Sequence, residues 1–151
     1  MADNADLARS LYDAWNRRDF DAQANATAAD GKIQVVGSGD TYDGPDGSRK
    51  YNTMWADAFP DGAITVDRVI PAGDTVVVEF TGRGTHTGDL VTPMGTIPAT
   101  GRSVTLQLCD VLEFHENKVR SQRSYFDTGS LMTQLGLTEQ AATAQRSAGK
   151  Q

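Results

Sequence analysis

The fold is decided near the C-terminal end of the chain, by the stretch SYFDTGSLMTQLG (residues 124–136). The residues before it alternate polar and apolar side chains, as a half-buried strand does, and Leu131 and Leu135 lie one helical turn apart. A strand is therefore predicted to end where a short helix begins. One face of a regular strand would carry Val119, Ser121, Arg123, Tyr125 and Asp127. We expect this face to present Tyr125 and Asp127 to a cavity that the helix helps to close.

The N-terminal part of the chain has the spacing of helices. Apolar residues recur every three or four positions over residues 3–18, which predicts an amphipathic helix. Asp19 fits the N-cap of a second, alanine-rich helix that ends near Ala29. A third helix is predicted over residues 45–58. The broad apolar face of this third helix consists of Tyr51, Met54, Trp55 and Phe59.

From Ile64 onward the pattern changes to strands. They are predicted over residues 64–70, 75–87, 103–114 and 119–125, and a short earlier strand is predicted near residues 33–36. Residues 71–74 and 115–118 have the composition of hairpin turns. Helices followed by an antiparallel meander predict an α+β fold rather than a parallel α/β sheet.

Length and charge narrow the classes of function. The 151 residues suit one domain, predicted over residues 1–137, with a flexible tail over residues 138–151. The net charge of −6, without a cluster of basic residues, argues against binding of nucleic acid or an anionic membrane. The N-terminus lacks an apolar signal segment, so we expect a cytoplasmic protein. The single cysteine, Cys109, cannot form an internal disulfide and fits a core position.

Asp127 is the first candidate for chemistry. A carboxylate withdrawn from water among aromatic side chains binds protons more tightly, which suits it to proton transfer near neutral pH. The alternative is structural, because an aspartate before Thr-Gly-Ser and a helical pattern is also a standard N-cap.

Two further residues could take part. Asp110 interrupts an apolar alternating series, so it either faces the cavity or marks a bulge. A buried carboxylate needs a partner, which could be Arg123 on the adjacent strand. Asp110 would then be either one half of a structural ion pair or a second catalytic carboxylate beside Asp127. His86 could polarise a carbonyl or relay a proton, or it could anchor a loop.

Signatures of other chemistries are missing from the sequence. The two histidines and one cysteine lack metal-ligand spacing, and no nucleotide-binding glycine loop or serine nucleophile elbow is found. We therefore expect chemistry without a metal or cofactor. The segment over residues 88–101 is too long for a tight hairpin and is predicted to be either a lid or a plain excursion of the sheet.

Four segments occur in a fixed order: GTHTG (residues 84–88), IPATGRSV (97–104), the run over 110–118 and the final Tyr125-x-Asp127. Together they resemble the SnoaL-like polyketide cyclases of the NTF2-like superfamily, which includes ester cyclase-like and ketosteroid isomerase-like proteins. The resemblance implies a cone, in which a strongly curved antiparallel sheet wraps around the N-terminal helices. It also implies that Asp127 is the general acid/base of an intramolecular aldol ring closure.

On this basis the expected ligand is a hydrophobic carbonyl compound. Asp127 would move the proton, and His86 and Arg123 would orient the substrate or stabilise an enolate. The residues expected to bind the substrate are Tyr12, Trp15, Tyr51, Trp55, Met94, Gln107, Asp110 and Tyr125. Alternatives are a non-catalytic binder, a dimerisation module and, less favoured, an epoxide hydrolase or ring-opening enzyme. We expect a homodimer or higher homo-oligomer.

Overall fold

The computed structural model describes residues 3–137. Its helices are α1 (Asn4–Asn16), α2 (Phe20–Asn25), α3 (Gly44–Ala58) and α4 (Thr128–Gln134). Its strands are β1 (Thr27–Val35), β2 (Thr41–Asp43), β3 (Ala63–Ala72), β4 (Thr75–Thr85), β5 (Leu90–Thr92), β6 (Gly95–Ile97), β7 (Ser103–His115) and β8 (Lys118–Phe126). The tail predicted over residues 138–151 lies outside the described residues. No helix among residues 3–137 is long and apolar enough to cross a membrane.

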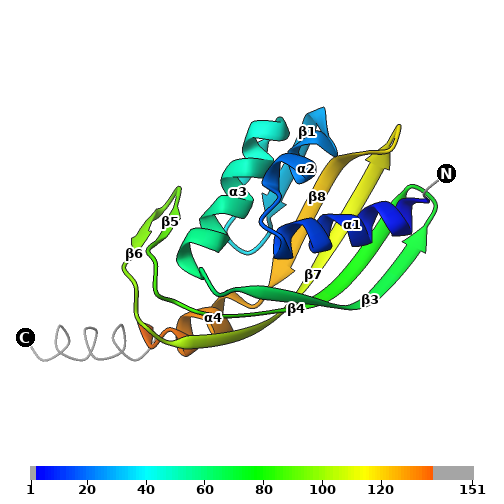
Figure 1. The fold of residues 1–151 in the computed structure, drawn as a ribbon. Helices are drawn as coiled ribbons and strands as arrows, with labels where there is room; N and C mark the ends of the chain where they lie inside the picture. The colour runs from blue at the N-terminus through cyan, green and yellow to red at the C-terminus, as the bar shows by residue number, and fades with distance from the viewer. Residues whose placement is uncertain (1–2, 138–151) are drawn as a thin grey trace, which may run out of the picture.

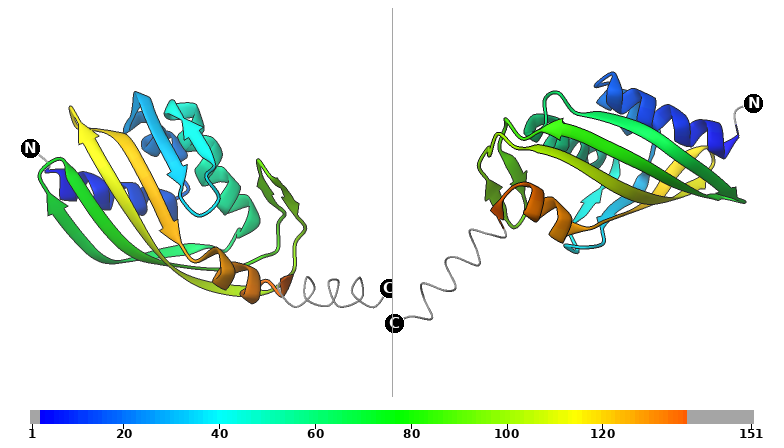
Figure 2. Two further views of the ribbon diagram at one scale, coloured as in Figure 1. Left: turned by 180° about the vertical axis from the view of Figure 1, so that it is seen from behind. Right: turned by 90° about the horizontal axis from the view of Figure 1, so that it is seen from below.

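Six strands form one curved sheet in the order β2-β1-β8-β7-β4-β3. The helices α1, α2 and α3 lie on the same face of this sheet (Figure 1). The view from behind shows the opposite face of β3, β4, β7 and β8 without a covering helix (Figure 2). The predicted α+β architecture, a curved sheet around N-terminal helices, is therefore confirmed.

The sheet is mixed rather than fully antiparallel. All pairs of neighbouring strands are antiparallel except the pair of β1 and β8, which is parallel. The first two helices return the chain to the edge formed by β8, so β1 joins the last strand of the meander. Local sequence cannot show this pairing, because it links residues that lie far apart in the chain.

Local signals explain the starts of the first two helices. Asp3 caps α1 by accepting from the backbone N–H of Asp6, and Asp19 caps α2 by accepting from Ala22 at 3.1 Å. The second helix ends at Asn25, earlier than predicted. Thr27 already belongs to β1, where it pairs with a residue of β8. Strand pairing thus overrides the helical propensity of the alanines that follow.

The inner face of the sheet forms the main core. In β7 the inward positions alternate from Val104 to Phe114 without interruption, and Asp110 is one of them. Strand β8 is less regular. Glu113 pairs with Ser121 but Phe114 pairs with Val119, so β8 contains one extra residue, Arg120. A bulge of this kind reverses which residues of a strand face the core.

The segment over residues 88–101 contains the hairpin β5–β6. This arm lies beside α3, and its buried Leu90 belongs to the same apolar cluster as Ala58 and Leu131 (Figure 1). Met94, at the tip of the arm, is 79% exposed. The two ends of the segment lie together, because the N–H of Gly101 donates to the carbonyl of His86, the residue that follows β4.

Candidate functional site

A cavity lies between the helices and the inner face of the sheet. Its wall combines residues of α1, α2 and α3 with inward residues of β4, β7 and β8. Most of the wall is apolar or aromatic, as in sites that bind small organic molecules. Its larger members are Leu11, Tyr12, Trp15, Tyr51, Trp55, Phe59, Ile64, Phe80, Val104, Leu106, Leu108, Val119 and Leu131.

Asp110 is the acidic side chain in this wall. It lies in the middle of β7 and is 3% exposed. The Tyr12 hydroxyl donates to its Oδ2 at 2.8 Å, and the Gln122 amide nitrogen lies 3.4 Å from the same oxygen. Its other oxygen, Oδ1, is buried and has no hydrogen-bond partner among the described residues. One carboxylate oxygen is thus held in place while the other is unpaired.

Burial raises the pKa of Asp110 to about 6, and the neighbouring hydroxyls of Ser124 and Tyr12 oppose part of that rise. The physical cause is the loss of water around the charged form. A carboxyl group of this pKa is mostly ionised at neutral pH, yet it accepts a proton more readily than a solvated aspartate. This combination suits a general base that must later return the proton.

Polar side chains of β8 connect Asp110 to α3. The Gln122 amide nitrogen lies 3.3 Å from the Ser124 hydroxyl oxygen, and the Tyr51 hydroxyl donates to that oxygen at 3.4 Å. Burial is the main cause that raises the pKa of Tyr51, so its hydroxyl stays protonated as a donor. The network fixes the side chains around the carboxylate from two sides.

Asp127 lies outside this wall. Its side chain is exposed and accepts from the Ser130 N–H at 3.1 Å, which caps α4. The structure therefore shows the N-cap geometry that the sequence offered as the alternative to catalysis. A solvent-facing carboxylate gives the predicted acid/base role no geometric support.

Arg123 and Tyr125 also face away from the cavity, so the predicted facing of this strand is wrong. The Arg123 guanidinium donates to the Tyr125 hydroxyl at 3.3 Å, and Tyr125 is 41% exposed. Arg123 pairs with Val111 rather than with Asp110. It is therefore not the partner of Asp110 that the sequence suggested. The reason is the bulge at Arg120, which turns the even-numbered residues of β8 inward.

His86 is fully buried at the end of β4, but it is not among the residues that line the cavity. Its Nδ1 accepts from the Thr100 N–H at 3.2 Å, and its ring lies 5.4 Å from the Phe59 ring, centroid to centroid. Burial lowers the pKa of His86, which favours the neutral ring. The contact with Thr100 ties the two ends of the 88–101 segment together, as a loop-anchoring histidine would.

Some of the predicted binding residues line the cavity and the others do not. Tyr12, Trp15, Tyr51 and Trp55 line the cavity together with Asp110. Met94 lies on the arm, beside a second hollow between the arm, α3 and α4. Gln107 is an exposed residue of β7 on the outer face.

Sequence reasoning missed Gln122, Ser124 and Gln23. The first two lie on the face that the bulge turns inward, and no local signal marks the bulge. Gln23 could have been found, because a glutamine in a short alanine-rich helix predicted to pack on its neighbours is an unusual core residue.

A family model for SnoaL-like polyketide cyclases matches residues 5–135. The chain belongs to this family. Among functionally curated proteins, no match was found.

Solved structures of other proteins share this fold. A candidate SnoaL-like cyclase from Jannaschia sp. CCS1 is 21% identical, with a TM-score of 0.78 over 87% of this chain and 90% of that one. IdmH from Streptomyces antibioticus, a candidate polyketide cyclase, is 25% identical, with a TM-score of 0.71 over 87% and 97%. A protein from Catenulispora acidiphila with a ketosteroid isomerase-like fold, in complex with trimethylamine, is 20% identical, with a TM-score of 0.72 over 87% and 92%.

Proposed function

We propose that the protein is a cofactor-independent enzyme of polyketide cyclase type that acts on a hydrophobic carbonyl compound. In this proposal Asp110 is the general acid/base, in place of Asp127. The supporting observation is one buried carboxylate in an apolar cavity, with Oδ2 held by Tyr12 and Oδ1 unpaired. Family membership supports the reaction class.

The chemistry follows from the two states of this carboxyl group. Ionised Asp110 takes a proton from the carbon next to a substrate carbonyl, and the electron pair of that C–H bond forms an enolate. The enolate carbon attacks a second carbonyl of the same molecule, which forms the new C–C bond and an alkoxide. Protonated Asp110 then returns the proton to the alkoxide. An isomerisation would differ only in returning the proton to another carbon.

The apolar wall supports this mechanism by excluding water. In such surroundings the charge on Asp110 is costly, and transfer of a proton to it relieves that cost. The Tyr12 hydroxyl keeps the carboxylate in one orientation through the proton transfers. Orientation of the base relative to the reacting carbon contributes a large share of such rate enhancements.

The first proton transfer can be tested with 2-tetralone, a bicyclic ketone with acidic protons next to its carbonyl. Exchange of these protons for deuterium is followed by NMR with the wild-type protein, Asp110→Asn and Asp127→Asn. We expect Asp110→Asn to lower the protein-catalysed rate by roughly 100-fold or more, the usual size of a general-base contribution. Asp127→Asn should retain the wild-type rate, because asparagine also caps helices well.

Full exchange activity in Asp110→Asn would contradict the proposal. Binding of 2-tetralone without exchange by the wild-type protein would favour the alternative, a non-catalytic binder of apolar carbonyl compounds. The expected homo-oligomer stays a prediction, which analytical ultracentrifugation would test.

A further inference from the structure

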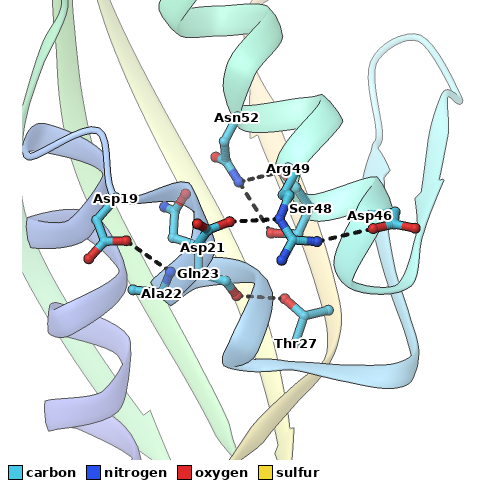
Figure 3. Close-up of polar contacts among 9 residues, drawn as sticks. All are labelled: Asp19, Asp21, Ala22, Gln23, Thr27, Asp46, Ser48, Arg49 and Asn52. Atoms are coloured by element: carbon cyan, nitrogen blue, oxygen red, sulfur yellow. Dashed lines mark hydrogen bonds and ion pairs between the residues drawn. The ribbon is translucent and has the colours of Figure 1, made fainter.

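One end of the cavity carries a group of neutral polar side chains. This polar end lies where α2 and α3 pack together, and Figure 3 shows its side chains between the two helices. Its members that line the cavity are Gln23 on α2, Thr27 at the start of β1, and Ser48 and Asn52 on α3. A polar group in a mostly apolar pocket usually fixes the orientation of the ligand.

Gln23 has a fixed amide orientation. It is 8% exposed, and its amide nitrogen donates to the backbone carbonyl of Leu11 at 2.9 Å. A carbonyl oxygen can only accept, so the atom facing Leu11 must be the nitrogen. The amide oxygen, Oε1, is buried on the other side and has no hydrogen-bond partner.

The neighbouring polar groups are engaged with one another. The Thr27 hydroxyl donates to the backbone carbonyl of Gln23 at 2.9 Å, and the Asn52 amide donates to the carbonyl of Ser48 at 2.8 Å (Figure 3). Neither contact reaches the amide oxygen of Gln23. Buried polar atoms without a partner are rare in native proteins, so each one calls for an explanation.

The unpaired atoms share one chemical character. Among residues 3–137, three buried side-chain atoms lack a partner, on Gln23, His86 and Asp110. Only the atoms of Gln23 and Asp110 belong to cavity-lining residues, and both are oxygens that accept hydrogen bonds. A complementary ligand must therefore bring hydrogen-bond donors, and a ligand that carries only carbonyl or ether oxygens would leave Gln23 unpaired.

Charge near this end favours a neutral group on the ligand. Arg49, on α3 close to this end, is bound to Asp21 at 2.9 Å and to Asp46 at 3.0 Å (Figure 3). Its guanidinium is thus engaged by two carboxylates on the solvent side of α2 and α3. Arg83, the cation among the cavity-lining residues, is an exposed residue of β4. An anionic group, such as a carboxylate or phosphate, cannot donate a hydrogen bond to the acceptor oxygen of Gln23.

We propose that Gln23 is a specificity-determining residue whose Oε1 accepts a hydrogen bond from a neutral hydroxyl group of the substrate. The substrate class is then a hydroxylated aromatic or polycyclic ketone that carries the hydroxyl away from the reacting carbon. This assignment of the substrate rests on the proposed function. The hydrogen bond itself requires only that a ketone binds in the cavity.

The test measures binding rather than turnover, through quenching of the fluorescence of Trp15 and Trp55, which line the cavity. The probes are 2-tetralone, its four isomeric derivatives with a hydroxyl at C5, C6, C7 or C8, and the corresponding methoxy compounds. We expect one hydroxylated isomer to bind the wild-type protein about 10-fold more tightly than 2-tetralone, as for one added neutral hydrogen bond. Its methoxy counterpart, which cannot donate, should lack this gain.

The variant Gln23→Met keeps the length of the side chain and removes the acceptor. We expect it to abolish the difference in affinity between the hydroxylated isomer and 2-tetralone, which is about 10-fold in the wild-type protein. Gln134→Met is the matched control. Gln134 also bonds to backbone groups, at Thr105, but it is not among the cavity-lining residues, so this variant should retain the gain.

Several results would overturn the assignment. For the wild-type protein, they are equal binding of all the compounds and failure to bind any of these ketones. For Gln23→Met, they are a gain in affinity from the hydroxyl that survives, and an equal loss of affinity for 2-tetralone and the hydroxylated isomer. If Gln23→Met does not fold, the hydroxyl and methoxy pairs test the same hydrogen bond with the unmodified protein. A hydroxyl preference without deuterium exchange would support Gln23 and contradict the catalytic role of Asp110.

Discussion

One aspartate lies in the middle of β7 and another directly follows β8, and their environments are opposite. Asp110 lies on the inner face, is 3% exposed and has one unpaired carboxylate oxygen. Asp127 lies where β8 gives way to α4, faces solvent and accepts from a backbone N–H. The comparison shows that strand facing, rather than residue type or nearness to aromatic residues in the sequence, decides which carboxylate lies in the wall of the cavity.

The largest expected difference between the two regions is in how stability depends on pH. Burial raises the pKa of Asp110 to about 6 in the folded protein, above the ordinary value of 3.8. The folded state therefore favours the protonated form of Asp110. The contribution of this carboxyl group to the free energy of unfolding is fully present below pH 3.8 and is lost as the pH rises through about 6. The loss amounts to roughly 3 kcal/mol. Asp110→Asn should avoid it.

Urea unfolding at low and neutral pH measures this difference. The free energy of unfolding of Asp110→Asn, relative to wild type, should rise by up to roughly 3 kcal/mol between about pH 3.5 and pH 7.5. Effects of all other carboxyl groups cancel in the comparison. A constant difference between the two proteins across this range would show that Asp110 titrates as an ordinary aspartate.

The pH dependence of catalysis should follow the same group. If ionised Asp110 is the base, deuterium exchange of 2-tetralone has an acid limb with a midpoint near pH 6, as the pKa of about 6 requires. At a pH two units lower the rate should fall about 100-fold, because only a small fraction of the carboxyl groups is ionised. Asp127→Asn should show the same limb, and a midpoint that moves in this variant would return the catalytic role to Asp127.

The substitution Tyr12→Phe should move the acid limb of the deuterium-exchange rate to higher pH. Burial is the main influence on the pKa of Asp110, but the Tyr12 hydrogen bond lowers it, so loss of the hydroxyl should raise it further. The aromatic contact with Phe80, at 4.9 Å between ring centroids, is retained in the variant. We expect a stability loss of about 1 kcal/mol, as for one hydrogen bond.

Tyr42→Phe is a suitable control for this substitution. The Tyr42 hydroxyl donates to the sulfur of Met54 at 3.5 Å, and Tyr42 lines the second hollow rather than the cavity of Asp110. The midpoint of its acid limb should stay at the wild-type pH. An unchanged midpoint in Tyr12→Phe as well would mean that the hydroxyl does not act on the carboxylate.

The smallest effect is expected at the end of β8. Asp127→Ala removes the N-cap of α4 and should lower the free energy of unfolding by about 1 kcal/mol, while Asp127→Asn should be nearly neutral. Thermal unfolding of both variants measures the difference. Equal stability of Asp127→Ala and wild type would show that the cap contributes nothing, and that another role for this side chain must be sought.

The sequence by itself determined the principal helices, the four long strands and the fold class, but not the short strands β2, β5 and β6. Helical spacing located α1 and α3, Asp19 marked the start of α2, and alternation located the four long strands, because these signals are local and each spans one element. The ordered segments from Gly84 to Asp127 led to the family that the comparison with its model then showed. Local patterns also placed four aromatic residues that line the cavity, Tyr12, Trp15, Tyr51 and Trp55.

Only the tertiary structure decided which carboxylate faces the cavity. Both answers were open in the sequence: Asp110 could face inward or mark a bulge, and Asp127 could catalyse or cap a helix. Asp110 faces inward because the alternation of β7 is unbroken, and in β8 the deciding feature is one extra residue, Arg120, in the pairing with β7. Such a bulge reverses the facing of Gln122 to Tyr125 without altering the alternation that the sequence displays, since register is a property of two strands and not of one.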